Sequence, residues 1–432
     1  MTPSLRILIA PSGFKESLGP EQVAECIEEG IRRVLPPTSA VTRKVPLHDG
    51  GEGFCRALTT TQHGEIRDLR VQGPLNKPID SHFGILPNKA AVLDMAAAAG
   101  LRLVPKDCRD PTRTTTFGVG ELIAAALDEG CSSIIIGCGD SGTSDGGAGM
   151  LQALGAKLLD DERKELPIAQ GGGSLSRLAS VDLSNIHPRL RNPGDRVPIE
   201  AVCNTKNVLC GAKGVARVYG PQKGATPEQV ENLSLALEKL AAAAKTLLGE
   251  EVGLKPGSGA SGGLGTGLML LGAQLRPRSD AVDEYFGLQS AFNETWDIVV
   301  SGEGSLDSQS AQGKMTVEVA KRAARQGAKV MILAGTIGDG AETLYEAGIT
   351  SFTSIMDGPA TLETAIQDAD RLLKDAAERT IRIIQMGMAI SPAPTSGAVL
   401  DKPKPLPLGV KANKPQRKPL SSMLKVARAM TG

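Results

Sequence analysis

The sequence predicts an α/β protein in which a flavodoxin-like, doubly wound sheet is split by a large inserted second α/β domain. Three observations favour this fold. Short apolar runs, typical of strands buried on both faces, alternate with helical segments near both ends of the chain. The 432 residues are too many for one ordinary core. Glycine is frequent (51 residues) and aromatic residues are few (3%), which favours α/β architecture with many glycine turns.

The first and last parts of the chain supply the split sheet. Strands are predicted at residues 5–10, 41–47, 297–301, 329–334 and 350–355. Helices are predicted at residues 20–34, 316–326, 341–347 and 362–386. Five strands with helices between them are what a flavodoxin-like sheet requires. The strand that starts at Asp297 is expected to break at Gly302 and Gly304, so that Glu303 lies on a turn.

The middle of the chain is predicted to form the second α/β domain. Its expected elements are a hairpin-like region at 66–92, helices at 118–129 and 227–248, and strands at 132–137 and 199–203. Thr226 is the expected N-cap of the long helix. Residues 171–195 are expected to be mostly irregular, and residues 256–268 to open a helix of small residues. The predicted domains are residues 1–47 plus 295–388, residues 48–294, and a disordered tail at 389–432.

Charge separates the tail from the rest of the chain. From Ser391 onward there are eight Lys or Arg residues against the single Asp401, so the tail has a net charge of +7. Because the whole chain is neutral, residues 1–390 have a net charge of −7. An acidic body with a short basic tail is not typical of a nucleic-acid binder. The tail lacks periodicity and predicts disorder, although residues 420–430 form an amphipathic piece that could bind a partner.

Composition also indicates the compartment. The chain has no apolar run of the roughly 18 residues that a membrane-spanning helix needs, and its start lacks the pattern of a signal peptide. The seven cysteines are scattered without a CxxC pair, so neither a disulfide framework nor a zinc site is indicated. We therefore expect a cytoplasmic protein with no membrane partner.

Carboxylates stand beside glycines at three predicted strand ends. These pairs are Asp49 with Glu52, Asp140 with Asp145, and Glu303 with Asp307. Lysines stand near such loops at Lys15, Lys223 and Lys314. Carboxylates that hold Mg²⁺ and lysines that contact phosphate oxygens are the groups that phosphoryl transfer requires. Because ligands of open α/β sheets bind beyond the carboxyl ends of the strands, the pattern predicts this chemistry in an interdomain cleft.

Other nucleotide motifs are weak or absent. Gly137-x-Gly139-x-x-Gly142 follows a predicted strand, as in a dinucleotide site, but Asp140 and Asp145 would place negative charge against a pyrophosphate. There is no Walker A motif, no protein-kinase signature set and no GxSxG elbow. A dinucleotide-dependent oxidoreductase nevertheless stays open as an alternative.

Several motifs resemble those of the type I glycerate kinases, in that family's order. They are IAPSGFKESL (9–18), DGGEG (49–53), RDPTRTTTFGVGEL (109–122), GDSGTSDGGAGM (139–150), VYGPQKGA (218–225), PGSGASGGLG (256–265) and SGEGSLDSQSAQGK (301–314). The resemblance covers about residues 5–385. It implies two α/β domains with the active site between them, and ATP-dependent phosphorylation of glycerate, usually to 2-phosphoglycerate.

The resemblance and the loop chemistry together give the expected site. We expect Asp145, Asp49 and Lys15 to act in catalysis, and Glu303 and Asp307 to hold Mg²⁺, with ATP as co-substrate. The residues expected to bind substrate or nucleotide are Gly50, Gly51, Glu52, Ser141, Thr143, Asn204, Lys223, Gly262, Gly263 and Lys314.

Some residues depart from the family pattern. The family usually has Asp where this chain has Ser12 and Asn204, and Gly-Ser-Ala-Thr-Asn-Asp where this chain has DSGTSD at 140–145. Each change of Asp to Ser or Asn removes a candidate base or Mg²⁺ ligand. A second alternative is therefore a weakened kinase homologue that senses a metabolite or acts as a scaffold. A homodimer and a partner bound by the tail also stay open.

Overall fold

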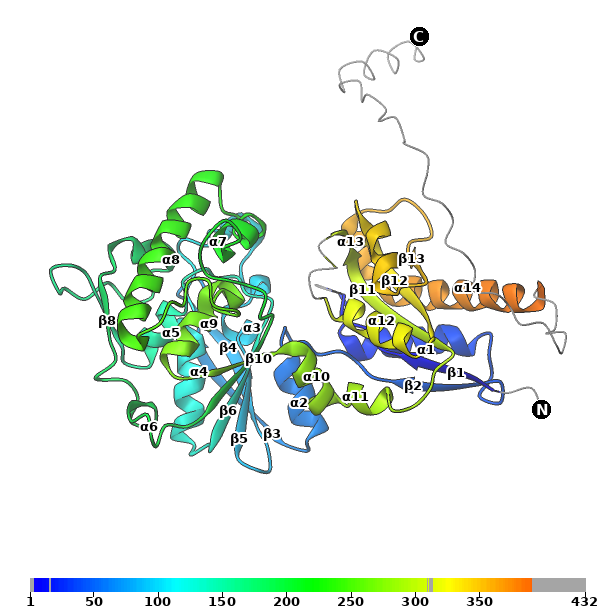
Figure 1. Ribbon diagram of the computed structural model, residues 1–432, viewed down its shortest axis with the longest axis horizontal. Coiled ribbons are helices and arrows are strands. Elements are labelled where there is room, and N and C mark those ends of the chain that lie inside the picture. Colours follow the sequence, from blue (N-terminus) through cyan, green and yellow to red (C-terminus); the bar gives the residue numbers. More distant parts are fainter. Residues whose placement is uncertain (1–3, 15–16, 309, 311–313, 391–432) are drawn as a thin grey trace, which may run out of the picture. The chain divides into compact units, whose positions relative to one another are not determined.

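The computed structural model describes residues 4–14, 17–308, 310 and 314–390, and Figure 1 shows its ribbon. Its strands form a five-stranded sheet in the order β13-β12-β11-β1-β2 and a six-stranded sheet in the order β10-β9-β6-β5-β4-β3. A two-stranded sheet pairs β7 (Lys157–Leu159) with β8 (Ser180–Asp182). The α/β class predicted from the sequence is therefore confirmed.

The five-stranded sheet joins both ends of the described chain. Its strands are β1 (Leu5–Ile9), β2 (Ala40–Lys44), β11 (Ile298–Leu306), β12 (Lys329–Ile337) and β13 (Ser351–Ser354). All neighbouring strands in it are parallel. If these five strands are renumbered 1 to 5 in chain order, their order in the sheet is 2-1-3-4-5. This is the order of the flavodoxin-like sheet that the sequence predicts.

Helices cover both faces of this sheet. Because successive strand residues point to opposite faces, Ile7 and Ile9 pack with α1 (Pro20–Arg32) and α14 (Ala369–Ile390). Leu8 packs on the other face, with α12 (Met315–Arg325). The same face holds the 3₁₀ helix η6 (Ala341–Ala347), at the segment where the sequence predicts an α-helix. The sheet is thus doubly wound.

The six-stranded sheet is mixed. Its strands are β3 (Glu65–Gln72), β4 (Pro78–Ile85), β5 (Ala90–Asp94), β6 (Ser133–Cys138), β9 (Ile199–Cys203) and β10 (Gln274–Pro277). The strands β10, β9, β6 and β5 are parallel neighbours, whereas β4 and β3 continue the sheet antiparallel, as the predicted hairpin region requires. The carboxyl ends of the four parallel strands therefore share one edge.

Two layers of helices cover this sheet (Figure 1). One face packs against α4 (Phe117–Asp128), α5 (Ala148–Ala153), α8 (Pro227–Leu248) and α9 (Ala260–Leu270). The other face packs against α2 (Phe54–Thr61) and α10 (Arg278–Phe286). Thr226 caps α8 as predicted, because its hydroxyl accepts a hydrogen bond from the Gln229 N–H. The remaining short helices are α3 (Ala96–Ala99), α6 (Pro188–Arg191), α7 (Val215–Tyr219), α11 (Leu288–Ala291) and α13 (Leu362–Gln367).

Helix α10 contributes to the cores of both sheets. Ala281 packs with Phe54 and Val202 in the core of the six-stranded sheet. Its neighbour Val282 packs with Leu288 in the core of the five-stranded sheet. By its internal contacts the chain up to Ile384 forms one unit, so the division at 47/48 and 294/295 stays a prediction.

Three local predictions differ from the structure. β11 does not break at Gly302 and Gly304 but continues to Leu306, because β12 extends in parallel and pairs Ser305 with Thr336. The predicted helix 362–386 is two helices, α13 and α14, and α14 continues to Ile390. The region 171–195 contains β8, α6 and a 3₁₀ helix at Gly172–Arg177. The tail from residue 391, including 420–430, lies outside the described residues.

In the part of the chain that the structure describes, no helix combines the length and apolar content needed to cross a bilayer.

The contact between α1 and α14 depends on a glycine. A Cβ built on Gly30 would lie 2.3 Å from the Lys374 carbonyl oxygen and 2.6 Å from the Ala377 Cβ, closer than real Cβ atoms approach. We therefore expect Gly30→Ala to separate the helices and to lower the free energy of unfolding by about 1–3 kcal/mol in urea titrations. Gly387→Ala, on α14 with no atom within 4 Å of the added Cβ, is the matched control. Equal stability of the two variants would contradict this packing.

Candidate active site

The candidate active site lies beyond the carboxyl ends of the parallel strands in the six-stranded sheet. β5 ends at Asp94, β6 at Cys138 and β9 at Cys203, and Arg278 directly follows β10. The loops after these strands are neighbours, because the strands are parallel and in register. This edge is where open α/β sheets bind ligands.

The loop that contains Asp49 packs closely against these strand ends. A Cβ on Gly50 would lie 2.8 Å from the Val202 carbonyl oxygen, and Gly50 has a left-handed φ of 88°. A Cβ on Gly139 would lie 2.6 Å from the Gly51 Cα. Only glycine permits both approaches. The glycines therefore bring the carboxylates of the loop to the strand ends.

Three carboxylates gather at this edge, each beside a donor. Asp140 Oδ2 accepts a hydrogen bond from the Glu52 N–H (3.1 Å). Asp49 forms an ion pair with Arg278 (2.5 Å), and Glu52 forms one with Arg102 (2.5 Å). Burial and the nearby charge of Asp140 raise the pKa of Glu52, whereas Arg102 opposes that rise. The edge therefore combines acids with guanidinium groups that can exchange partners with an anionic ligand.

Asp145 is buried in the loop before α5, and its oxygens already accept four hydrogen bonds. Oδ2 accepts from the Thr116 N–H (2.8 Å), the Thr116 hydroxyl (2.8 Å) and the Gly149 N–H (3.2 Å), and Oδ1 accepts from the Gly147 N–H (3.1 Å). Burial raises its pKa, and these donors oppose the rise. The carboxylate thus fixes the loop against the start of α4 and occupies the N-terminus of α5.

Lys223 is also buried, with 3% of its surface exposed. Its ammonium donates to the Ser141 hydroxyl (2.8 Å) and to the Thr143 carbonyl oxygen (2.6 Å). Lys223 therefore contacts two other predicted binding residues, Ser141 and Thr143. This geometry gives Lys223 a part in shaping the loop that follows Asp140.

The start of α9 packs against the same loop. Ser261, Gly262 and Gly263 have left-handed φ values of 50°, 72° and 91°. A Cβ on Gly262 would lie 2.0 Å from the Thr143 carbonyl oxygen, so that the two backbones are in direct contact. Gly262 and Gly263 thus lie against the loop that contains Thr143.

A second set of charges follows β11. Glu303 is 5% exposed, and its two carboxylate oxygens accept from Lys314 and from the Thr316 hydroxyl. Lys314 also donates to the Ser305 carbonyl oxygen (2.5 Å). Burial raises the pKa of Glu303, Lys314 opposes this rise, and the charge of Asp307 adds to it. Two carboxylates, Glu303 and Asp307, therefore repel each other beside one lysine.

A pocket of about 120 Å³ joins groups from both sheets. Asn204, after β9, and Arg278, after β10, line it together with Lys314, at the start of α12. Its other lining residues are Cys203, Thr205, Lys206, Pro277, Ser279, Met315, Val317, Glu318 and Lys321. The ion pair of Arg278 with Asp49 links this pocket to the acidic edge of the six-stranded sheet.

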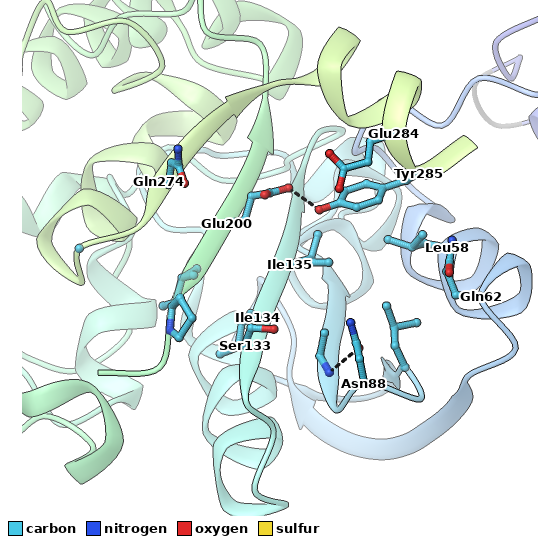
Figure 2. A pocket seen from close by; sticks show the side chains of 15 residues that line it. Leu58, Gln62, Asn88, Ser133, Ile134, Ile135, Glu200, Gln274, Glu284 and Tyr285 are labelled. Carbon is cyan, nitrogen blue, oxygen red and sulfur yellow. Dashed lines mark hydrogen bonds between the residues drawn. The ribbon is translucent and has the colours of Figure 1, made fainter. Parts of the chain in front are cut away.

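A larger pocket, of about 610 Å³, lies away from these residues (Figure 2). Its floor includes Ser133 and Ile135 at the beginning of β6 and Glu200 at the beginning of β9. On one wall the Tyr285 hydroxyl donates to Glu200 (2.7 Å). None of the predicted site residues that the structure describes lines this pocket. It therefore carries no part of the function predicted from the sequence.

One predicted catalytic residue, Lys15, lies outside the described residues. Within the described ranges, no group of three or more His, Cys, Asp or Glu side chains is arranged to hold a metal ion. A Mg²⁺ that accompanies a nucleotide needs only one or two protein carboxylates besides phosphate oxygens. Glu303 and Asp307 fit that smaller requirement, because a cation would offset the burial of the Glu303 carboxylate, which is the main cause of its raised pKa, and also the nearby charge of Asp307.

Sequence reasoning missed Arg278 and Asp94. Arg278 follows β10, which has too few apolar residues to be recognised as a strand. Asp94 ends β5 in an alanine-rich stretch and accepts from the Ala97 N–H (2.9 Å) and the Cys55 N–H (3.2 Å). A charged residue directly after an apolar run was the available signal for Asp94.

The chain was compared with known proteins. A sequence model of the glycerate kinase family matches residues 7–385. A glycerate kinase of Bacillus subtilis is 43% identical over 90% of this chain and 98% of its own length. A glycerate 2-kinase of Escherichia coli is 39% identical over 89% of this chain and 99% of its own length. A crystal structure from Salmonella typhimurium LT2, 38% identical, superposes with a TM-score of 0.69 over 90% of this chain and all of that one.

The four hydrogen bonds to Asp145 generate a stability prediction. Asp145→Asn keeps one acceptor oxygen but turns an amide NH₂ toward buried donors, and each buried donor left without a partner costs about 1–3 kcal/mol. We expect the free energy of unfolding to fall by at least about 2 kcal/mol in urea titrations. Asp161→Asn, at an exposed loop position, should leave it unchanged. A stable Asp145→Asn protein would remove the loop-organising role.

Asp94 generates a pH prediction. Burial raises its pKa from 3.8 to about 6, so its stabilising contribution is complete below 3.8 and is lost as the pH rises through about 6. Between about pH 5 and about pH 8 this loss corresponds to about 1.4 kcal/mol. We expect Asp94→Asn to lose that much less stability over the same range in urea titrations. Parallel pH profiles for wild type and variant would show that Asp94 does not titrate as described.

Proposed function

The chain belongs to the glycerate kinase family. It is therefore a small-molecule kinase, a transferase that uses an alcohol group as acceptor. We propose that it phosphorylates glycerate with ATP at the 2-hydroxyl. ATP is the co-substrate that this family uses. The product we propose is 2-phosphoglycerate, as the name of the E. coli relative indicates for that protein. The substrates are then glycerate and ATP.

The observation that carries this proposal is the pocket that Asn204, Arg278 and Lys314 line together. The ion pair of Arg278 with Asp49 connects this pocket to the carboxylates at the edge of the six-stranded sheet. The ion pair of Lys314 with Glu303 connects it to the carboxylates that follow β11. Phosphoryl transfer is catalysed mainly by positioning and by neutralising charge. Acids and cations around one pocket supply both, which supports an active site in a cleft between the two sheets.

We assign the acceptance of the substrate proton to Asp49. The glycerate hydroxyl oxygen forms a bond to the terminal phosphorus of ATP, the bond from that phosphorus to the bridging oxygen breaks, and ADP leaves. The hydroxyl proton passes to Asp49, whose side chain is 35% exposed. Asp145, the other candidate base, has its oxygens occupied by loop donors, so we assign it a positioning role.

The remaining predicted residues keep binding roles in this proposal. Glu303 and Asp307 would hold Mg²⁺, which when bound neutralises phosphate charge. The backbone N–H groups of the glycine loops would cradle anionic oxygens. The residues to which we assign these substrate- or nucleotide-binding roles are Gly50, Gly51, Glu52, Ser141, Thr143, Asn204, Lys223, Gly262, Gly263 and Lys314. A cytoplasmic location, a homodimer, a partner of the tail and the absence of nucleic-acid binding also stay proposals.

Two alternatives remain separable by experiment. A dinucleotide site at Gly137 to Gly142 is disfavoured because α5 starts only at Ala148 and its N-terminus is occupied by the Asp145 carboxylate. A weakened homologue that senses or scaffolds is motivated by Ser12 and Asn204. Ser12 lies next to β11, because its N–H donates to the Gly302 carbonyl oxygen (2.9 Å).

The test is ADP release by the purified protein with Mg²⁺ and ATP, across D-glycerate, L-glycerate and other small hydroxy acids. We expect glycerate-dependent release, and phosphorus-coupled NMR of the product should place the phosphate on the second carbon. Phosphate on the third carbon would overturn the proposed regiochemistry alone. A folded protein that binds ATP but turns over no acid would favour the sensor or scaffold, and NADH binding in fluorescence titrations would favour the oxidoreductase.

The assignment of the base generates a kinetic prediction. Asp49→Asn should reduce kcat by about 10²–10⁴-fold, because a positioned general base contributes that much. The comparison uses kcat per mole of folded protein, so that loss of stability is not counted as loss of chemistry. Asp68→Asn, on the exposed side of β3, is the control for removing a carboxylate. An Asp49→Asn protein with wild-type kcat would exclude Asp49 as the base.

A further inference from the structure

Among the charged side chains that line the pocket at the start of α12, cations outnumber carboxylates. Lys206, Arg278, Lys314 and Lys321 are its four cationic side chains, and Glu318 is its one carboxylate. They come from the loop after β9, the first residue of α10 and the start of α12. A small cavity with cations on several sides concentrates positive potential and attracts anions.

Two of the pocket's four cations are already in ion pairs, Arg278 with Asp49 and Lys314 with Glu303. Glu318 is paired with Arg322, outside the pocket (3.2 Å). Neither Lys206 nor Lys321 forms an ion pair with any residue that the structure describes, and both are exposed. The pocket therefore presents two ammonium groups that form no ion pair with a carboxylate of the described residues.

The start of α12 adds to this imbalance. The N-cap residue of α12 is Lys314, and its side chain accepts no hydrogen bond from the helix. The first backbone N–H groups of this 11-residue helix therefore have no carboxylate or hydroxyl acceptor at the cap position. The positive end of the helix dipole disfavours nearby cations. Met315, the first helical residue, lines the same pocket as the lysines. Glu318 already places one carboxylate in the first turn of the helix, and an anion bound in the pocket would stabilise this helix start further.

The size of the pocket restricts the anion. Since one water occupies about 30 Å³ of liquid, 120 Å³ corresponds to roughly four waters. That volume suits one tetrahedral oxyanion, and the rest of a larger ligand would lie outside the pocket. The charge of the lining also exceeds what one carboxylate requires, whereas a polyphosphate end carries several negative charges.

We propose that Lys206 and Lys321, together with Arg278 and Lys314, form a phosphate subsite that binds the polyphosphate end of the nucleotide. This inference rests on the proposed function and adds two lysines to its site. Lys206 and Lys321 hold phosphate oxygens electrostatically, and the N–H groups at the start of α12 contribute as helix termini do. A phosphorylated product offers the same oxyanion chemistry, so the experiment must separate the two sources.

The test uses the full chain with the double substitution Lys206→Gln and Lys321→Gln. Loss of two charge contacts should raise the KM for ATP by about 10–100-fold, since each tenfold change is 1.4 kcal/mol. The KM for glycerate and the midpoint of thermal unfolding should change little. The matched control is Lys213→Gln with Lys239→Gln, two exposed lysines that do not line the pocket.

Calorimetric titration with inorganic tripolyphosphate gives a readout that does not need turnover. We expect wild type and control to bind it, and the Lys206/Lys321 variant to bind it at least about 10-fold more weakly. If the wild-type protein released no ADP with glycerate, this titration would still test the subsite. Failure of the proposed function can therefore be distinguished from failure of the proposed phosphate subsite. An unchanged affinity for tripolyphosphate in the variant would overturn the subsite.

The kinetic arms identify the occupant. A rise in the KM for ATP without a change in inhibition by 2-phosphoglycerate supports the nucleotide as the source of the phosphate. Weaker inhibition by 2-phosphoglycerate with an unchanged KM for ATP would overturn that assignment in favour of the product. A rise in the KM for glycerate alone would show that the lysines bind the substrate carboxylate instead.

Discussion

The close approach of the Asp49 loop to the strand ends is the constraint on which the site depends. Gly51 and Gly139 lie so near each other that a side chain on Gly139 would enter the Gly51 backbone. This contact holds Asp49 and Glu52 beside Asp140, and through Arg278 it connects them to the pocket beside α12. A larger residue at either glycine would therefore displace several charges at once, although it carries no charge itself.

The charged residues of the site divide by burial. Asp145 and Lys223 are almost fully buried and are occupied by donors and acceptors of their own loops. A buried charge is tolerated only with such partners, so these residues are suited to fixing loop shape. Lys206 and Lys321 are exposed and lack such partners in the described chain, which suits them to a ligand that arrives and leaves. Burial thus separates the residues that shape the loops from those to which we assign ligand contacts.

The sequence was sufficient for the elements whose apolar runs are strong. The five parallel strands of the flavodoxin-like sheet and the capped helix α8 follow from periodicity and from Thr226. β10 could not be predicted, because its four residues QLRP form a strand only through pairing with β9. The continuation of β11 through Gly302 likewise depends on its partner strand. The lysines of the pocket could not be grouped, because they are brought together by loops and a helix distant in sequence.

The order of strands in the five-stranded sheet has a consequence for synthesis. β1 lies between β2 and β11, and Arg6 bonds to Asp297, 291 residues later in the chain. All strands of the six-stranded sheet leave the ribosome before β11 does. The middle of the protein can therefore fold while β1, an apolar strand, still lacks one neighbour. The nascent chain must keep this early strand from associating with other chains until its last third has been made.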